Sequence, residues 1–397
     1  MFTKIMDTIF PSSEMYSLYM QRSLLKENIM NQILYLYTIY KRNRWIIPLI
    51  LLVMSVQITN SQTTTRTIQG STPLGSFGGI MNPDLSFIVD IRGLFREKDD
   101  NAKNKLLLSA VEFALGGYLH PGIRGDVILA LDQDYSTGGP ATEIELEEAF
   151  ISFLDMPLGL QIIAGRKLVD FGNINRFHLH HYPFSDSPLV LEHFFGHHSW
   201  GDDGVNLSFL VPNPFDIYFK TSFSMLNGKP LCPHALVLWD GNRRVYNSRV
   251  SVDLPWIKSI AGYSRAWDEG DGNTIENIEF TYKYQWPGFV YRRLKLQNEY
   301  IWTKTTNQKI TSGFYSLVVF SFNQYYEIGS RYDGLFSDEN KIEDWAGSFF
   351  ATRYLSHSVY MRGHYKFVGN EQSGEKENMF FLQISWGLGP HAHRLED

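Results

Sequence analysis

The amino-acid sequence predicts an all-β protein, a transmembrane barrel of antiparallel strands in up-and-down order. Three observations predict this fold. Segments in which apolar and polar residues alternate with a period of two recur between Leu85 and Leu388. These segments run about ten to thirteen residues, the length that a tilted strand needs to cross a membrane. The connections between them alternate between short and long, as the turns and outer loops of a transmembrane barrel do.

The alternation is clear in the first segment, where Leu85, Phe87 and Val89 fall on one side and Asp90 and Arg92 on the other. A soluble β-sandwich also alternates, and it remains an alternative, but its strands are usually nearer five or six residues. Two segments, 143–154 and 257–267, do not keep one apolar face, and the glutamates of the first suit a position at the rim. We expect about 16 strands, beginning near Leu85, Leu106, Ile123, Glu143, Leu160, Asp203, Asp216, Arg244, Ile257, Thr274, Phe289, Lys309, Gln324, Asp344, Ser358 and Asn378.

The connections support this strand number. Five of the seven short ones contain proline, which presets turn geometry and cannot lie within a ladder of hydrogen bonds. Eight long and seven short connections require sixteen strands, with both ends of the barrel on the side of the short periplasmic turns. The short connections are 119–122, 155–159, 212–215, 255–256, 286–288, 321–323 and 356–357, and the long ones are 97–105, 134–142, 172–202, 227–243, 268–273, 303–308, 334–343 and 368–377.

The N-terminal part predicts export. An apolar block, Trp45–Ile58, follows several basic residues and is too short to span a bilayer comfortably, so residues 1–61 read as an N-terminal extension with a secretory signal peptide. An uncleaved anchor is the alternative, and Met30 is a plausible true start. We expect a flexible periplasmic lead-in at 62–84, the barrel at 85–389 and a polar tail at 390–397. The single cysteine excludes an intrachain disulfide, and the net charge of −6 argues against nucleic acid as a partner.

The polar faces of the strands are expected to line a lumen. Ten basic and ten acidic residues fall on these faces, which predicts mutual pairing and a weakly charge-selective pore. A barrel of this size is wide enough for an aqueous channel, although the same face is also consistent with a solvated, non-conducting wall. The predicted pore-lining residues are Asp90, Arg92, Arg124, Asp126, Lys220, Arg249, Glu279, Lys283, Arg293, Lys295, Glu299, Glu327, Arg331, Arg362, His364 and Lys366. Further acidic residues expected on the inner face are Glu112, Asp132, Asp216, Asp253 and Asp333.

The segment 172–202 is the third long connection and holds six of the twelve histidines. In general porins of sixteen strands the third loop folds into the barrel and narrows it. Ser187 as N-cap, Pro188, the run LVLEHFF and a Gly196 stop predict a short helix with an apolar side that favours burial. We therefore expect a constriction loop, with Asn175, Arg176, His178, His181, Glu192 and His193 at the narrowed part.

The histidines of this segment also fit a metal site. His193 and His197 are four residues apart, and His178, His180 and His198 complete a nitrogen-rich set for zinc or copper. No diagnostic metal motif such as HExxH occurs, and loop histidines often only form hydrogen bonds. Ser199, near His197, His198 and Asp202, is the nearest approach to a catalytic triad, but neighbours in sequence do not make a triad. We expect no enzyme activity and no cofactor, apart from the possible zinc.

Two stretches carry a resemblance to a known family. The run Ala164–Gly196 and the ending QISWGLGPHAHRLED are similar to bacterial outer-membrane porin-like proteins, members of which are described as porin-like or as zinc-regulated outer-membrane receptors. The resemblance implies a barrel in the bacterial outer membrane, with the lipid bilayer and the outer-membrane assembly machinery as partners and no defined substrate. The chain departs from the family in having a polar tail after Leu388 instead of a terminal aromatic residue. The assembly machinery would therefore have to recognise residues within the last strand, namely Phe380, Leu382, Ile384 and Trp386.

The predicted function is passive diffusion of small hydrophilic solutes through the barrel. An energy-coupled receptor needs about twenty-two strands and a plug domain, for which the lead-in leaves no room. Two alternatives stay open: a receptor that binds a transition metal through the His-rich segment, and a structural barrel that does not conduct. An oligomer is possible.

Overall fold

The structure is a computed structural model that describes residues 83–97, 105–133, 142–196, 199–215, 217–229, 239, 241–270, 272–304, 310–336 and 341–389. The barrel lies within residues 73–397. The predicted signal peptide, nearly all of the predicted lead-in and the predicted polar tail lie outside the described residues.

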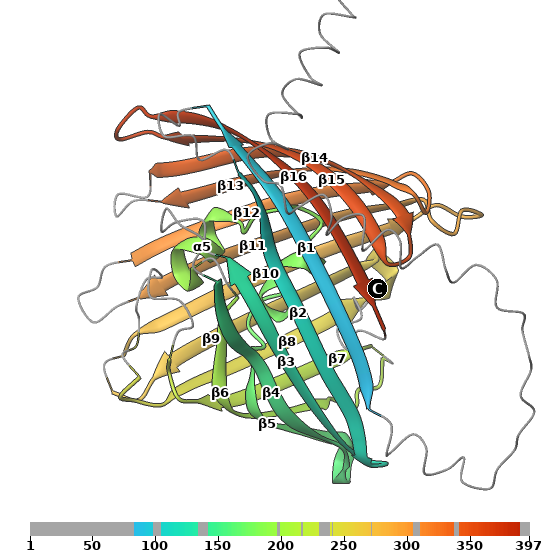
Figure 1. The fold of residues 1–397 in the computed structure, drawn as a ribbon. Coiled ribbons are helices and arrows are strands. Elements are labelled where there is room, and N and C mark those ends of the chain that lie inside the picture. Colours follow the sequence, from blue (N-terminus) through green and yellow to red (C-terminus); the bar gives the residue numbers. More distant parts are fainter. Residues whose placement is uncertain are drawn as a thin grey trace, which may run out of the picture. The chain divides into compact units, whose positions relative to one another are not determined.

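Sixteen strands form one closed antiparallel barrel (Figure 1). Each strand pairs with its neighbours in sequence, and β1 pairs with β16 to close the sheet. The predicted fold class and strand number are confirmed. The strands are β1 (Asp84–Arg96), β2 (Lys105–His120), β3 (Ile123–Gln133), β4 (Thr142–Met156), β5 (Leu160–Leu168), β6 (Gly201–Leu210), β7 (Phe219–Leu226), β8 (Val245–Leu254), β9 (Ser259–Asp268), β10 (Thr274–Gln285), β11 (Arg293–Lys304), β12 (Ile310–Ser321), β13 (Tyr326–Phe336), β14 (Ile342–Ser356), β15 (Val359–Asn370) and β16 (Lys376–Leu388).

The predicted strand beginnings differ most from the structure at β11, which was expected near Phe289 and starts at Arg293. The turn before it is longer than its proline and glycine suggest. Trp286 donates a backbone hydrogen bond to the carbonyl of Arg292 at 3.1 Å, so the turn closes only at that residue. Two short 3₁₀ turns, η1 (Pro157–Gly159) and η4 (Pro255–Ile257), lie in other short connections, as their prolines favour.

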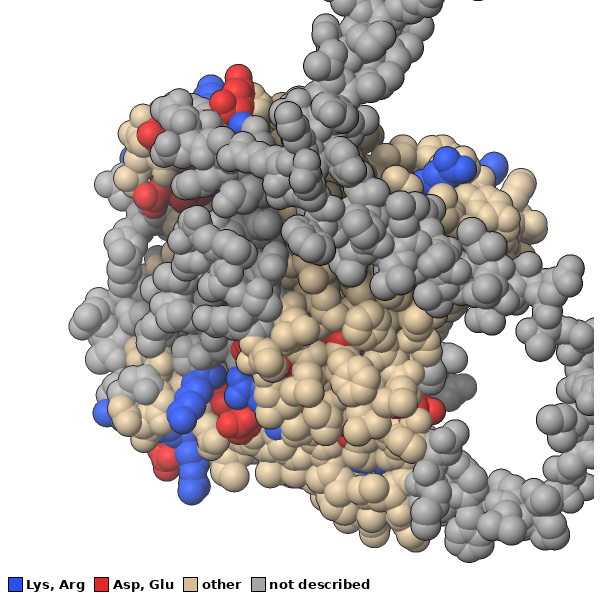
Figure 2. All heavy atoms as spheres, in the orientation of Figure 1, with Lys and Arg blue, Asp and Glu red and all other residues tan. Residues whose placement is uncertain are grey.

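The side chains of the wall alternate between an apolar outside and a polar inside. On β16, Phe380, Leu382 and Ile384 point outward and are 40%, 46% and 39% exposed, whereas Gln383 and Ser385 between them are 1% and 3% exposed. Large apolar side chains on the outside are what a barrel presents to lipid. On the face in Figure 2, lysine, arginine, aspartate and glutamate gather mainly near the margins of the wall.

Tryptophans lie near both ends of the outer wall. Trp267, Trp302 and Trp345 are close to the long-loop ends of β9, β11 and β14, while Trp286 and Trp386 are close to the short-turn ends of β10 and β16. Such aromatic side chains anchor a barrel at the two interfaces of a membrane. Their positions agree with a barrel that spans a membrane along its strands.

Strand β4 contains a β-bulge at Glu147. Ile128 of β3 pairs with Glu148, but the next residue, Leu129, pairs with Leu146, so Glu147 has no partner in the register. A bulge redirects side chains, and here both glutamates lie inside the barrel: Glu148 is 0% exposed and the side chain of Glu147 is 13% exposed. The bulge explains why this strand does not keep one apolar face, and it turns Glu147 and Glu148 toward the lumen.

We expect the substitution Leu382→Arg to lower the free energy of unfolding in lipid vesicles by about 2–4 kcal/mol, because this residue lies near the middle of β16 and faces lipid. Leu388→Arg, at the end of the same strand, is the control and should cost about 0–1 kcal/mol, because arginine there reaches the interface. Urea unfolding followed by tryptophan fluorescence measures both. Equal costs at the two positions would contradict the assigned lipid face.

Candidate functional site: the lumen and loop 3

The connection between β5 and β6, residues 169–200, folds into the barrel, and we call it loop 3. Its two legs meet where Val169 donates a backbone hydrogen bond to the carbonyl of Trp200 at 2.8 Å. Asn175 ties the legs together, because its Nδ2 donates to the carbonyls of Val169 and Trp200 at 2.9 and 3.0 Å and its Oδ1 accepts from the Trp200 N–H at 2.6 Å. Asn175, predicted at the constriction, therefore closes the neck of the loop.

The predicted helix is present in loop 3 as α5 (Leu189–Phe195). Its predicted N-cap is wrong by one residue: Pro188 occupies the cap in place of Ser187, and its carbonyl accepts the N–H of Glu192 at 3.0 Å. The predicted stop is right, since Gly196 has a φ of 84° that an L residue rarely adopts. Among the described residues, no helix has both the length and the apolar character needed to cross a membrane.

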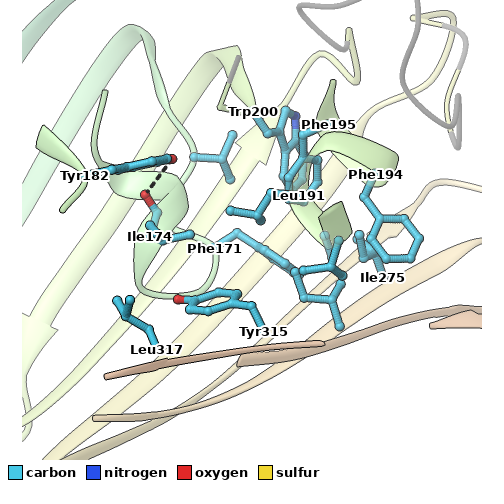
Figure 3. Close-up of a cluster of buried hydrophobic side chains, with 14 of the residues drawn as sticks. Phe171, Ile174, Tyr182, Leu191, Phe194, Phe195, Trp200, Ile275, Tyr315 and Leu317 are labelled. Carbon is cyan, nitrogen blue, oxygen red and sulfur yellow. Dashed lines mark hydrogen bonds between the residues drawn. The ribbon is translucent and has the colours of Figure 1, made fainter. Parts of the chain in front are cut away.

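Apolar side chains of loop 3 pack against apolar side chains of the inner wall (Figure 3). A barrel lumen is usually polar, so an apolar patch inside it needs a partner that excludes water. Each large apolar side chain buried in this way contributes about 1.5–3 kcal/mol. From the loop come Val169, Phe171, Ile174, Tyr182, Phe184, Val190, Leu191, Phe194, Phe195 and Trp200, and from the inner wall Val245, Ala266, Ile275, Ile301, Tyr315, Leu317, Val319 and Phe350.

One polar anchor of loop 3 is Asp186. Its carboxylate accepts a hydrogen bond from Nη2 of Arg331 at 3.0 Å and one from Nζ of Lys366 at 2.6 Å, and it lies 3.6 Å from Nδ1 of His364. Burial by itself raises the pKa of Asp186, but the charges of Arg331 and Lys366 outweigh burial and hold that pKa well below its usual range. Asp186 is therefore ionised and fixes this part of the loop to β13 and β15.

The backbone beside this anchor is also held by the wall. Arg92 donates from Nη1 to the carbonyl of Ser185 at 3.0 Å, and Arg362 donates from Nη1 to the carbonyl of Phe184 at 3.1 Å. The hydroxyl of Ser185 donates to Oε1 of Gln383 at 2.9 Å. Strands β1, β15 and β16 therefore all bind the same short stretch of loop 3.

A second anchor, at Asp170, holds the start of the loop to the opposite wall. Its carboxylate lies 3.2 Å from Nη1 of Arg249 on β8 and accepts a hydrogen bond from the Ser222 hydroxyl on β7 at 2.7 Å. Burial raises the pKa of Asp170, while Arg249, Arg176 and Lys220 lower it by more, so it too lies below its usual range.

The next turn of the loop binds Glu299 on β11. The carboxylate of Glu299 accepts the backbone N–H of Asn173 at 3.3 Å and that of Ile174 at 3.0 Å, and it also accepts from Asn277 and Tyr315. A buried carboxylate with this many donors is well satisfied. Glu299, predicted to line the pore, is a partner of the loop backbone.

A third edge of loop 3 meets β2 and β4 through histidines. Nδ1 of His178 lies 3.1 Å from Oε2 of Glu147, and Nδ1 of His180 lies 2.7 Å from Oε1 of Glu112. The two imidazoles are stacked, with ring centroids 5.9 Å apart. Burial disfavours the charged imidazolium of His178, but the charges of Glu147 and Glu112 and the hydrogen bond to Glu147 outweigh it and raise the pKa of His178 to about 10.

Loop 3 therefore crosses the lumen and touches the wall on many sides. Its described contacts reach β1, β2 and β4, and every strand from β7 to β16. A loop that only lined one side would leave the opposite wall in contact with solvent. Loop 3 is thus held at many points around the inner wall.

Most predicted pore-lining side chains are buried inside the barrel. Five others, Arg124, Lys220, Lys283, Arg293 and Lys295, lie near the short-turn ends of their strands and are more exposed. Whether any of them meets a solute stays a prediction. Asp216 and the side chain of Asp132 lie outside the described part of the chain. The buried ones, each at most 7% exposed, are Asp90, Arg92, Asp126, Arg249, Glu279, Glu299, Glu327, Arg331, Arg362, His364 and Lys366.

Other residues predicted at the constriction bind within the loop or lie on α5. Arg176 donates to Oδ1 of Asn173 at 2.9 Å, and the ring of His181 lies 4.0 Å from that of His180. Glu192 and His193 are half-buried on α5. Ser199, considered as a nucleophile, donates its hydroxyl hydrogen bond to the carbonyl of Phe177 at 3.0 Å.

The predicted metal set is only partly brought together. His178 and His180 are neighbours, but His197 and His198 lie outside the described residues. Within the described ranges, the group with metal-ligand spacing is Glu112, Glu147 and His178, and it does not include His193. Sequence reasoning did not place either glutamate in this group, although the broken alternation of β4 is a signal for a bulge near Glu147.

We expect Gly172→Ala to displace the first turn of loop 3 from its contacts with the wall. Gly172 has a φ of +62°, and an added Cβ would lie 2.3 Å from Oε2 of Glu299 and 3.2 Å from Nδ2 of Asn277. The clash and the backbone strain together should cost about 3 kcal/mol. Hydrogen–deuterium exchange of the peptide 170–178 in the folded protein should rise strongly.

The matched control is Gly374→Ala. Gly374 has a φ of +70° and no atom within 4 Å of the added Cβ, so only the strain of about 1 kcal/mol remains. Exchange in loop 3 should then stay as in the unmodified protein. If both substitutions left hydrogen–deuterium exchange in loop 3 equally slow, the described packing of Gly172 against Glu299 and Asn277 would be wrong.

The chain is similar to known proteins in sequence and in fold. It is 24% identical to an uncharacterised protein of Aquifex aeolicus over 379 residues, which cover 78% of this chain and 79% of that protein. No family model matches the sequence.

Solved structures with a similar fold are bacterial porins. An anion-selective porin from Comamonas acidovorans is 14% identical and has a TM-score of 0.54, with 77% of this chain and 99% of that chain covered. OprB of Pseudomonas putida is 10% identical with a TM-score of 0.55, covering 77% and 94%. OmpF of Salmonella typhi, in complex with daunomycin, is 12% identical with a TM-score of 0.54, covering 77% and 97%. With its closed barrel of sixteen strands and its apolar outer surface, the chain has the porin fold and is a β-barrel of the bacterial outer membrane.

Proposed function

We propose that this protein is an outer-membrane channel for small hydrophilic solutes and that loop 3 sets its conductance. The observation that carries the proposal is the set of ionic anchors that hold an irregular loop across a wide barrel, at Asp170, Asp186 and His178. Sixteen strands enclose enough space for an aqueous channel. A loop that rests on ion pairs and hydrogen bonds is suited to adjusting that space.

The charge of the lumen supports weak selectivity. The cations Arg249, Arg331 and Lys366 project from the wall, and the loop carboxylates Asp170 and Asp186 lie against them. Strong selectivity needs one sign of charge to dominate a constriction. The Comamonas acidovorans porin is described as anion-selective, and the neutralised wall of this chain favours a weaker preference.

A barrel that never conducts is the second candidate. The apolar packing of α5 against the inner wall favours it, because buried Phe194 and Phe195 resist release of the loop into water. We propose no enzyme activity in either case. A channel of this kind would have the lipid bilayer and the outer-membrane assembly machinery as partners. The assembly machinery would recognise the outward residues of β16. The channel function is compatible with a monomer and with an oligomer.

Single-channel recording in planar bilayers tests the proposal. We expect small conductance steps from the unmodified protein and larger ones from the double variant Asp170→Asn/Asp186→Asn. The double substitution removes the ion pairs that hold the loop to two opposite walls, so the loop should be held less firmly there. The exposed wall cations should also shift the reversal potential toward chloride.

Asp155→Asn is the matched control, because Asp155 is exposed at the short-turn end of β4, away from loop 3. Its conductance should equal that of the unmodified protein. Folding of each variant is checked by circular dichroism and by gel mobility without heating. If neither the unmodified protein nor the folded double variant ever conducts, the channel proposal is wrong and the structural barrel replaces it.

A further inference from the structure

Three side chains from different parts of the chain meet at the third edge of loop 3. Glu112 projects from β2, Glu147 from the bulge of β4 and His178 from the loop. One carboxylate oxygen of each glutamate and one imidazole nitrogen all lie within 4.8 Å of one another. Their side chains are 4%, 13% and 5% exposed, so they are withdrawn from bulk water.

This donor set has a definite chemical preference. Two carboxylates and an imidazole suit first-row divalent transition metals such as Zn²⁺, whereas Ca²⁺ and Mg²⁺ prefer oxygen ligands alone. Ligand atoms of one tetrahedral zinc ion are about 3.3–3.6 Å apart, because each bond is about 2.0–2.2 Å long. The three groups therefore need to move by less than about 1 Å to bind one ion.

Neighbouring groups support the three ligands. His180 lies 2.7 Å from Oε1 of Glu112 through its Nδ1. The carbonyl of His180 in turn accepts the hydroxyl of Tyr360 from β15 at 2.8 Å, which fixes the turn that carries both histidines. Hydrogen-bonded partners of this kind orient the ligands of metal sites.

We propose that Glu112, Glu147 and His178 bind one divalent transition-metal ion, which links loop 3 to β2 and β4. A water or a further side chain would fill the remaining position, as in zinc sites with three protein ligands. The proposal does not require that the barrel conducts, because binding of the ion depends only on the buried edge of the loop.

The sign of the local charge is consistent with a cation at this point. Three carboxylates, those of Glu112, Glu147 and the buried Glu148, gather at this edge, where His178 lies against Glu147 and His180 lies against Glu112. A divalent ion would compensate this charge more completely. The apolar edge of loop 3, around α5, offers no comparable group among the described residues.

Isothermal titration of the folded protein in detergent with ZnCl₂ tests the site. We expect one Zn²⁺ per chain and no binding of Mg²⁺. Glu147→Gln and Glu112→Gln, which keep the shape of the side chain, and His178→Ala should each weaken binding by about 100-fold or more. His180→Ala should weaken it by about 10–100-fold, as expected for a supporting residue.

Matched controls lie elsewhere on the barrel. His357→Ala in a short turn and Glu371→Gln in a long loop remove the same types of group from exposed positions and should leave binding unchanged. His193→Ala separates this site from the set predicted by sequence. Loss of binding in His193→Ala with full binding in Glu147→Gln would overturn the proposal.

Cobalt provides a readout in the unmodified protein, so the test does not depend on the variants folding. Co²⁺ bound by three protein ligands and water should give visible absorption bands that Zn²⁺ abolishes at one equivalent. Absence of both the bands and the zinc heat signal would also overturn the proposal. A barrel that binds zinc but never conducts would contradict only the channel function.

Discussion

A chain segment inside a barrel loses most of its water, and its backbone N–H and C=O groups then need protein partners. Loop 3 meets this requirement through charged side chains of the wall. Glu299 accepts the N–H of Ile174 at 3.0 Å, Arg92 donates to the carbonyl of Ser185 at 3.0 Å, and Arg362 donates to the carbonyl of Phe184 at 3.1 Å. The charges of the lumen thus hold an irregular chain in place before they act on any solute.

Charged side chains of the wall also form ion pairs with one another, independently of loop 3. Residues two apart on a strand lie on one face, and Arg92 with Asp90, Arg124 with Asp126 and Arg331 with Asp333 are pairs of this kind. The loop adds further carboxylates to cations that already have partners, as Asp186 does at Arg331. Breaking one contact therefore leaves each arginine with a remaining counter-ion, which lowers the cost of moving the loop relative to a lone buried pair.

Much of the fold could be predicted from the sequence because period-two alternation and turn chemistry are local. The inward course of loop 3 also followed from its apolar residues and helix signals. What could not be predicted depends on register: the bulge that turns Glu147 inward arises from its pairing with β3. The sequence does contain a sign of the apolar patch on the inner wall. The stretch Phe314–Phe320 is nearly continuous in apolar residues, as in strands buried on both faces, but the alternation of the other strands makes this exception easy to miss. Partners such as Asp186 and Lys366 are 180 residues apart, and spacing cannot reveal them.

The edges of loop 3 use different physical interactions, and this difference decides how the loop can respond to its surroundings. The edge at α5 is apolar, with Val190 close to Gly313 of β12, and apolar burial is insensitive to small ions. The edges at Asp170 and Asp186 are ion pairs, which weaken when a partner is neutralised. The edge at Glu147 combines imidazole with carboxylate and can exchange a proton for a metal ion. Neutralising a partner would therefore weaken the charged edges and leave the apolar edge at β12 and β13 unchanged.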